Sequence, residues 1–254
     1  MIPKTIHYCW FGKNEKPALA KRCISSWRKR CPDYTIVEWN ENNYDLDSAP
    51  LYVRQAYEQK KWAFVTDFVR LWVISEYGGI YLDTDVELIK SLDPFLKYSA
   101  FFGMEDNNLV ATGLGFGAEK GMPLLNRLMN DYLDVPFVMS DGTLDTTSCP
   151  ERNTPVFQAM GFVPENRLQI LQDDVAVFPT QFFCPLSYIT GKKKVTSDTV
   201  SIHWYSASWL SEKQLKYNKR VRKNKRLRPI KDLLKKVLGN RISAFLKRIV
   251  YGKK

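Results

Sequence analysis

The stretch WAFVTDFVRLWVISEYGGIYLDTDV, residues 62–86, decides the fold. Its first half predicts a helix over 62–76, because apolar side chains recur there at the spacing of one buried helix face. These side chains are Val65, Phe68, Val69, Trp72 and Val73. Glycine is the favoured residue just past a helix end, so the pair at 78–79 marks where this helix stops.

A strand is predicted directly after the two glycines, over Ile80–Ile89. Side chains alternate between the two faces of a strand, so Asp83 and Asp85 leave the same face. Two converging carboxylates are the ligands of a hard divalent cation such as Mn²⁺ or Mg²⁺. Such an ion would bridge a diphosphate and neutralise the charge that develops as it leaves. Most Asp-x-Asp pairs are solvated turn residues, but two like charges among aromatic and β-branched neighbours would be costly without a cation.

The flanking sequence predicts an α/β domain. A strand over Thr5–Phe11, a helix over 17–30 and a strand over Tyr34–Trp39 open the chain, and this alternation is typical of an α/β sheet. Later strands are predicted at 100–104, 114–117, 175–178 and 200–204, a helix at 123–132 and a loop-rich region at 134–155. By alternation His7 points with Cys9 rather than with Trp10, so we expect His7 in the core.

Two segments of the deciding stretch, AFVTDFVRL at 63–71 and YGGIYLDTDV at 77–86, closely resemble glycosyltransferase family 32. That family contains Asp-x-Asp sugar transferases, among them fungal outer-chain mannosyltransferases and bacterial capsule and lipopolysaccharide enzymes. The glucosylating clostridial toxins show the same pattern more distantly. IPKTIHYCW at 2–10 is similar to the family's opening strand and IHWYSASW at 202–209 to its closing motif, so the likeness covers roughly residues 2–210.

The resemblance implies a GT-A fold, a nucleotide-binding sheet flanked by helices, and sugar transfer with retention of anomeric configuration. A nucleotide-sugar donor, a saccharide acceptor and Mn²⁺ or Mg²⁺ are implied with it. Carried over residue by residue, Asp85 would bind the metal, Asp83 would contact the ribose or a metal-bound water, and His203 would be a late metal ligand. The residues implied in donor binding are Trp10, which would stack on the base, Asp67 and Arg70 at the donor sugar and ribose, and Ser208 or Trp209 at the β-phosphate.

Four of these residues also have a structural interpretation. Asp67 and Arg70, three positions apart on a helix, could form a surface ion pair. His203, beside Trp204, could be a structural histidine, and Trp10 could be a core residue of its strand. The segment Asp145–Pro155 is longer and more polar than the corresponding turn of the family, so the choice of acceptor is the property that the resemblance transfers least.

The net charge of +11 arises entirely in the C-terminal part of the chain. Residues 212–254 hold 17 Lys and Arg against 2 Asp and Glu, a net charge of +15, whereas the remaining residues carry −4. Apolar residues recur at helical spacing from Ile230 to Ile249, so a basic amphipathic helical tail is predicted, one that would bind an anionic membrane surface. We therefore expect a catalytic domain over 1–211 and a tail over 212–254.

The remaining expectations concern location and substrates. Five cysteines without a C-x-x-C pair indicate reduced thiols, and we expect a cytoplasmic protein held peripherally at the inner face of a membrane. A nucleic-acid-binding protein using the tail is the rival class. It is disfavoured, and no nucleic-acid partner is expected, because the basic residues of the tail alternate with aliphatic ones at helical spacing and almost no aromatic residue is expected to be exposed for base stacking. A UDP-sugar donor is favoured, with GDP-mannose as the alternative, and a lipid-linked saccharide in cell-surface polysaccharide synthesis is the expected acceptor.

Overall fold

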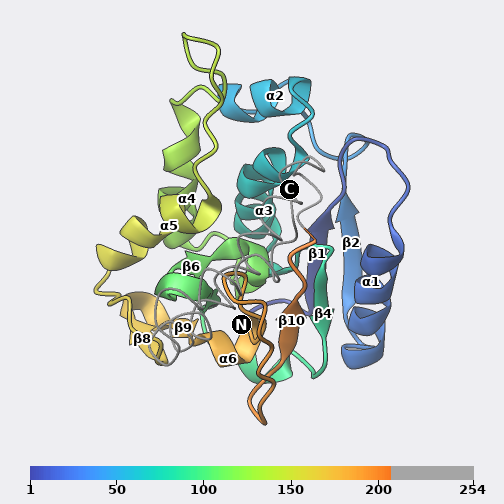
Figure 1. Cartoon of the computed structure of the whole chain (residues 1–254), viewed down its shortest axis with the longest axis vertical. Helices are drawn as coiled ribbons and strands as arrows, with labels where there is room; N and C mark the ends of the chain where they lie inside the picture. The colour runs from blue at the N-terminus through green and yellow to red at the C-terminus, as the bar shows by residue number, and fades with distance from the viewer. Residues whose placement is uncertain (207–254) are drawn as a thin grey trace, which may run out of the picture. The chain divides into compact units, whose positions relative to one another are not determined.

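The computed structural model describes residues 1–206, of which 1–187 and 193–206 form one compact unit. Ser208, Trp209 and the predicted tail at 212–254 lie outside the described residues. All five cysteines are free. Among the described helices, none combines the length and the apolar content needed to cross a membrane. The predicted α/β class, with helices flanking a sheet, is confirmed (Figure 1).

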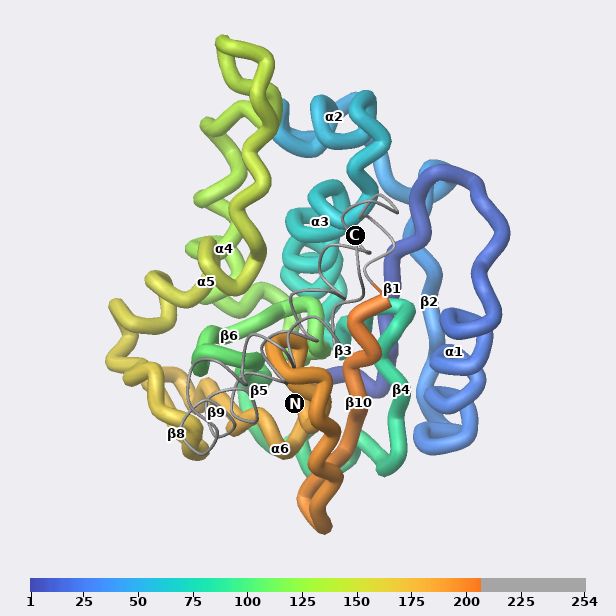
Figure 2. The backbone as a smooth tube through the Cα atoms, in the orientation of Figure 1, coloured from blue at the N-terminus to red at the C-terminus, as the bar shows by residue number. Residues whose placement is uncertain are grey.

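The main sheet is mixed, with the order β2-β1-β3-β7-β5-β9-β8, and β6 pairs with β5. Its strands are β1 (Thr5–Cys9), β2 (Thr35–Trp39), β3 (Gly79–Tyr81), β5 (Ala100–Met104), β6 (Val110–Ala111), β7 (Phe116–Ala118), β8 (Gln169–Leu171) and β9 (Val175–Phe178). A second, two-stranded sheet pairs β4 (Val86–Leu88) antiparallel with β10 (Ser201–His203) (Figure 2).

Six α-helices are present in residues 1–206: α1 (Ala18–Arg30), α2 (Leu51–Glu58), α3 (Trp62–Tyr77), α4 (Pro123–Leu133), α5 (Cys149–Gln158) and α6 (Thr180–Phe183). Short 3₁₀ turns are η1 (Asp93–Phe95), η2 (Asp106–Asn108), η3 (Thr112–Leu114) and η4 (Gln172–Asp174). Helix α1 packs along β4, and α3 packs along β1 (Figure 1). Two hydrophobic clusters result. Neighbours in β5 such as Phe101 and Phe102 belong to different clusters because successive side chains leave opposite faces.

Strand direction places the predicted site residues at one edge of the main sheet. Strands β1, β2 and β3 are mutually parallel; β7 is antiparallel to both β3 and β5, and β9 is parallel to β5. Five strands therefore run the same way, and the residues that follow them lie along a common edge. Ligands of open α/β sheets bind outside the carboxyl ends of such strands.

The predicted helix over 62–76 is confirmed as α3, and the two glycines end it as expected. Gly78 and Gly79 have φ angles of +68° and +107°, a region that disfavours other residues. A Cβ on Gly79 would lie 2.7 Å from the carbonyl oxygen of Thr5, so the glycine also permits β3 to approach β1 closely. The start of β3, and with it the position of the aspartates, is thus fixed by backbone packing.

The predicted single strand over Ile80–Ile89 is wrong. The chain leaves the main sheet after Tyr81, turns at residues 82–85 and enters the second sheet as β4. The turn is closed by the Val86 amide, which donates to the carbonyl oxygen of Asp83 at 2.9 Å. Asp83 and Asp85 therefore project from a turn between two sheets and not from one face of a strand.

The predicted loop region 134–155 is wrong in its last part, where α5 begins at Cys149. A capping box holds this start: the backbone amide of Ser148 donates to the carboxylate of Glu151, and the Ser148 hydroxyl receives a backbone amide in return. Pro150 occupies the first turn, where its missing N–H costs nothing. The helix lies beside the edge at which β3 and β5 end, as its contacts with β6 and η3 show.

Candidate metal and donor site

Asp83, Asp85 and His203, the three residues expected to hold a metal, are brought together. One ligand atom of each lies within 4.8 Å of the others. The first two come from the turn after β3, and His203 ends β10, whose pairing with β4 sets it opposite Val86. Two carboxylates and an imidazole at this spacing fit a divalent cation, and the imidazole favours a transition metal such as Mn²⁺ over Mg²⁺, which prefers oxygen ligands.

Asp85 is the most firmly held of the three. Its Oδ1 lies 3.1 Å from Nε2 of His203, and its Oδ2 accepts the backbone amide of Ser206 at 2.8 Å. Burial would raise the pKa of Asp85, but the charge of His203 and these hydrogen bonds lower it well below its usual range. Asp85 is therefore an anion at neutral pH, the form that a metal ligand requires.

Arg70 and Asp67 form a buried group beside the metal ligands. Nη2 of Arg70 lies 3.0 Å from Oδ1 of Asp67 and 3.4 Å from Oδ1 of Asp83. Only 7% of Asp67 and 3% of Arg70 are exposed, which rules out a surface ion pair. Burial raises the pKa of Asp67 to about 6 in spite of Arg70. Tyr81 completes the group, because its hydroxyl donates to Oδ1 of Asp83 at 3.0 Å.

The N–H groups of Arg70 are unequally engaged. Nε donates to the carbonyl oxygen of Thr66 at 2.9 Å, and Nη2 donates to the Thr66 hydroxyl at 3.0 Å in addition to its carboxylate partners. Nη1 has only a long contact, 3.8 Å, to the sulfur of Cys149. The Nη1 side of the guanidinium is therefore the side with donors available to a ligand.

Three residues that the sequence analysis did not single out close the site around Arg70. Cys149, at the start of α5, contacts Nη1. Gly113, in η3, has no side chain because a Cβ there would lie 2.8 Å from Oδ2 of Asp83 and 3.0 Å from Nη1 of Arg70. Asn153 ties α5 to η3 by donating to the Thr112 hydroxyl at 3.1 Å. Only the capping box at Ser148 could have signalled this arrangement in the sequence.

Glu105 is a further acidic residue that the sequence analysis missed. It follows β5 directly and so lies on the same edge as Asp83. Burial raises its pKa to about 7, although the positive charge of His203 acts in the opposite direction. The charge of Glu105 in turn raises the pKa of both His203 and Cys149, so the carboxyl group lies near both residues.

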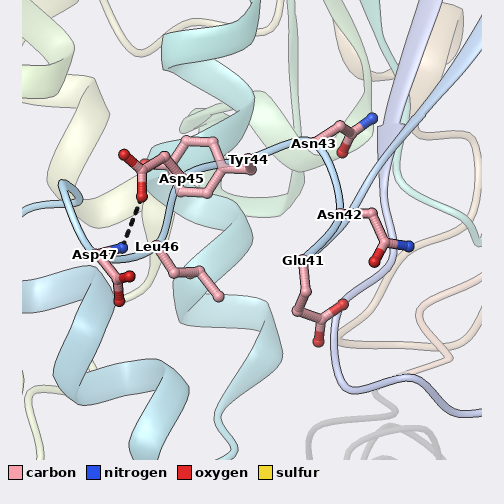
Figure 3. A pocket seen from close by; sticks show the side chains of 7 residues that line it. All are labelled: Glu41, Asn42, Asn43, Tyr44, Asp45, Leu46 and Asp47. Carbon is pink, nitrogen blue, oxygen red and sulfur yellow. Dashed lines mark hydrogen bonds between the residues drawn. The ribbon is translucent and has the colours of Figure 1, made fainter.

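Trp10 follows β1 at this edge, and its backbone amide donates to the carbonyl oxygen of Trp39 at 2.8 Å. It is partly exposed, and its indole N–H donates to the carbonyl oxygen of Asn14 at 2.6 Å. The turn after β2 lines an open hollow formed by residues 41–47 (Figure 3). None of the three candidate metal ligands lines this hollow, so it is separate from the metal site. Base stacking by Trp10 stays a prediction.

Fold and site together define an α/β protein in which residues that could hold a metal ion lie next to a buried arginine–aspartate pair. Residues 17–102, about a third of the chain, match the family described as "Glycosyltransferase sugar-binding region containing DXD motif". The predicted resemblance to the DXD-containing glycosyltransferases is thereby confirmed, and the matched segment contains Asp67, Arg70, Asp83 and Asp85.

Curated relatives agree with this family. Inositol phosphoceramide mannosyltransferase 3 of Schizosaccharomyces pombe is 31% identical over 138 residues, 51% of this chain and 37% of the relative. Mannosyl phosphorylinositol ceramide synthase CSH1 of Saccharomyces cerevisiae is 31% identical over 119 residues, 40% of this chain and 27% of the relative. The chain thus spans about a third of the length of these relatives.

Solved structures with partial likeness include the PaToxG glycosyltransferase, with a TM-score of 0.47 and 20% identity over 63% of this chain and 70% of that one. Another is a glycosyltransferase involved in glycosylation of the major capsid of PBCV-1, with a TM-score of 0.45 and 12% identity over 85% and 98% of the two chains. Both TM-scores lie below 0.5.

Proposed function

We propose that this chain is a metal-dependent, retaining glycosyltransferase that moves a sugar from a nucleotide-sugar donor to a hydroxyl group of an acceptor. The observation that carries the proposal is the convergence of Asp83, Asp85 and His203 within 4.8 Å, directly beside the Asp67–Arg70 pair. Metal ligands and a buried cationic donor in one place suit the diphosphate and the sugar of such a donor.

In this proposal each side chain has a distinct role. Asp85 and His203 would hold Mn²⁺ with Asp83, and the bound cation would neutralise charge on the departing diphosphate. Nη1 of Arg70, whose one contact among the described residues is the long one to Cys149, would bind the donor sugar, while Asp67 would accept hydrogen bonds from its hydroxyl groups. Trp10, at the end of β1, would stack on the base, and Ser208 or Trp209 would contact the β-phosphate.

For the chemical step we propose front-face displacement. The bond from the anomeric carbon to the phosphate oxygen breaks as the bond to the acceptor oxygen forms on the same face. The acceptor proton passes to the phosphate oxygen that leaves, so no side chain need act as nucleophile. The protein contributes positioning and electrostatic stabilisation, which are the principal means of catalysis where no covalent intermediate forms.

Two donors remain candidates, each supported by a different observation. Trp10 at the end of an opening strand like that of the clostridial toxins favours a UDP-sugar. The two curated relatives are named for mannose transfer to inositol phosphoceramide, or for making its mannosyl product, and they favour mannose as the sugar, with GDP-mannose as its donor. Their names also favour an inositol- or sugar-bearing lipid as acceptor, which suits peripheral attachment of a basic tail at the inner membrane face.

A donor screen tests the proposal. The full chain is incubated with Mn²⁺ and UDP-glucose, UDP-galactose, UDP-N-acetylglucosamine or GDP-mannose, and release of the nucleoside diphosphate is measured. We expect one donor to be cleaved well above the others, and cleavage to stop when EDTA is added. Equal, metal-independent rates with all four donors, or no cleavage of any, would contradict the proposed function.

A further inference from the structure

Glu105 occupies a position at the active edge for which the proposed function gives no role. Strand β5, which it follows, runs in the same direction as β1 and β3. Its backbone is fixed, because its amide donates to the carbonyl oxygen of Leu109 at 2.9 Å. Glu105 therefore follows β5 at the same edge at which Asp83 follows β3, and β7 lies between these two strands.

The carboxylate of Glu105 has no hydrogen-bond donor among residues 1–206, although the residue is partly buried. Its oxygens are not among the fully buried polar atoms of the described residues, so a ligand can reach them, while burial of the rest of the side chain disfavours the charged form. The negative charges of Asp106 and Glu151 disfavour that form further, since both raise the pKa of Glu105. An acidic group left in this state beside a metal site points to a ligand that supplies hydrogen-bond donors.

We propose that Glu105 binds the acceptor by accepting hydrogen bonds from the hydroxyl groups of a saccharide or an inositol ring. This inference rests on the proposed function and adds the acceptor side to it. Hydroxyl groups are the donors that such a substrate presents in quantity, and a carboxylate can accept from two neighbouring ones at once.

The donor substrate is a poorer fit to Glu105 than the acceptor. A nucleoside diphosphate is anionic, so the negative charge of the Glu105 carboxylate would repel it. Arg70, the buried cation that would bind the donor, is carried by α3, which packs against β3. In the strand order, β7 separates β3 from β5. The charge of Glu105 acts on His203 and on Cys149, so the acceptor would bind near the end of β10 and the start of α5.

The test compares two reactions of the same enzyme. Donor cleavage by water needs the metal and Arg70 but no acceptor, whereas transfer needs all three. With the best donor of the screen, transfer to methyl α-D-mannopyranoside and to myo-inositol 1-phosphate is measured beside hydrolysis, about one pH unit above the pKa of Glu105. We expect Glu105→Gln to lower the ratio of transfer to hydrolysis at least ~10-fold and Glu105→Ala at least ~100-fold, with hydrolysis within about twofold of wild type.

Asp106→Asn is the matched control, because Asp106 is the next residue, is acidic and accepts a hydrogen bond from Ser187 at 3.0 Å. Its ratio should equal that of wild type. An unchanged ratio in Glu105→Ala would overturn the inference, and so would equal losses of hydrolysis and transfer, which would make Glu105 a donor-side or nucleophilic residue. Failure of the proposed function is seen separately, as a wild-type protein that cleaves no donor, and it would overturn the acceptor role as well.

Discussion

Arg70 of α3 is ion-paired to Asp83 in the turn after β3, with 3.4 Å between Nη2 and Oδ1. The same nitrogen lies 3.0 Å from Oδ1 of Asp67. One buried cation thus balances two carboxylates from different elements, and it joins the helix to the turn that carries two of the candidate metal ligands. The position of the candidate metal site relative to α3 therefore depends on this side chain.

Replacement of Arg70 should damage both stability and activity. Arg70→Ala leaves two buried carboxylates without a cation, and we expect the free energy of unfolding to fall by about 3–5 kcal/mol. Arg70→Lys keeps the charge but loses the planar fork, so most of the stability should return while kcat/KM for the donor stays at least ~10²-fold low. Urea unfolding and donor hydrolysis per folded molecule measure the two effects.

Arg167→Ala is the control for Arg70, because Arg167 pairs with Glu165 at 2.7 Å and both side chains are about 60% exposed. Such a pair contributes little, and neither stability nor activity should change measurably. If Arg70→Lys showed the wild-type kcat/KM, Arg70 would have a structural role only.

Asp85 is expected to be the most sensitive metal ligand. Asp85→Asn removes the anion that is held by His203 and Ser206, and hydrolysis of the donor should fall by on the order of 10³-fold. Asp93→Asn, which changes an exposed acid paired with Lys4, should leave hydrolysis unchanged. Full activity of the wild-type protein in EDTA would show that no metal is needed.

The fold could be predicted from the sequence where a pattern of apolar residues extended over many positions. Periodicity over α3 and the glycines after it gave the helix and its end almost to the residue. The break between β3 and β4 could not be seen, because the alternation of apolar and polar residues continues through the turn at 82–85. Helix α5 was missed although Ser148 and Glu151 form a capping box; it contains Pro150 and Pro155, and proline is unfavourable inside a helix.

The candidate site was predictable only in part. Asp67, Arg70, Asp83 and Asp85 belong to one continuous motif, whereas His203 came from the resemblance alone. Glu105 and Gly113 carry no signal of their own in the sequence. Their roles depend on the order of the strands, which puts β7 and η3 between β3 and β5, and a single sequence does not reveal that order.

His7 should make stability depend on pH, because it is buried as a neutral imidazole. It accepts the indole N–H of Trp39 at Nδ1 and donates from Nε2 to the carbonyl oxygen of Gly78, both at 3.1 Å. Burial lowers the pKa of His7 to about 4 from 6.5. The contribution of His7 to the stability of the folded state is fully present above pH 6.5. It is lost as the pH falls towards 4, because the unfolded chain binds the proton first. The contribution amounts to about 3 kcal/mol.

Urea unfolding of wild type and His7→Gln across this pH range measures the effect of His7. His203, the other histidine, is present in both proteins, so the difference between them isolates His7. We expect the variant to be less stable at neutral pH and its stability to fall less steeply on acidification. Parallel curves for the two proteins would exclude this contribution.

Deletion of residues 213–254 tests the predicted tail. The segment 212–254 carries a net charge of +15, and each basic residue near an anionic bilayer contributes about 1 kcal/mol. The full chain should co-sediment with anionic vesicles, bind neutral ones poorly and be released by salt, since the Debye length falls to about 3 Å at 1 M. The shortened chain should cleave the donor normally but transfer slowly to a lipid-linked acceptor. Equal transfer by both chains would refute the anchor.

The central claim is that Asp83, Asp85 and His203 hold a cation through which a nucleotide donor is bound. Isothermal titration calorimetry of the full chain tests this claim without knowledge of the sugar or the acceptor. The affinity for UDP and for GDP is measured once in the presence of Mn²⁺ and once in the presence of EDTA. We predict that one of the two nucleotides binds with Mn²⁺ and that its affinity falls at least ~10²-fold in EDTA and in Asp85→Asn, but not in Asp93→Asn. Equal affinity with and without the metal, in wild type and Asp85→Asn alike, would contradict the account.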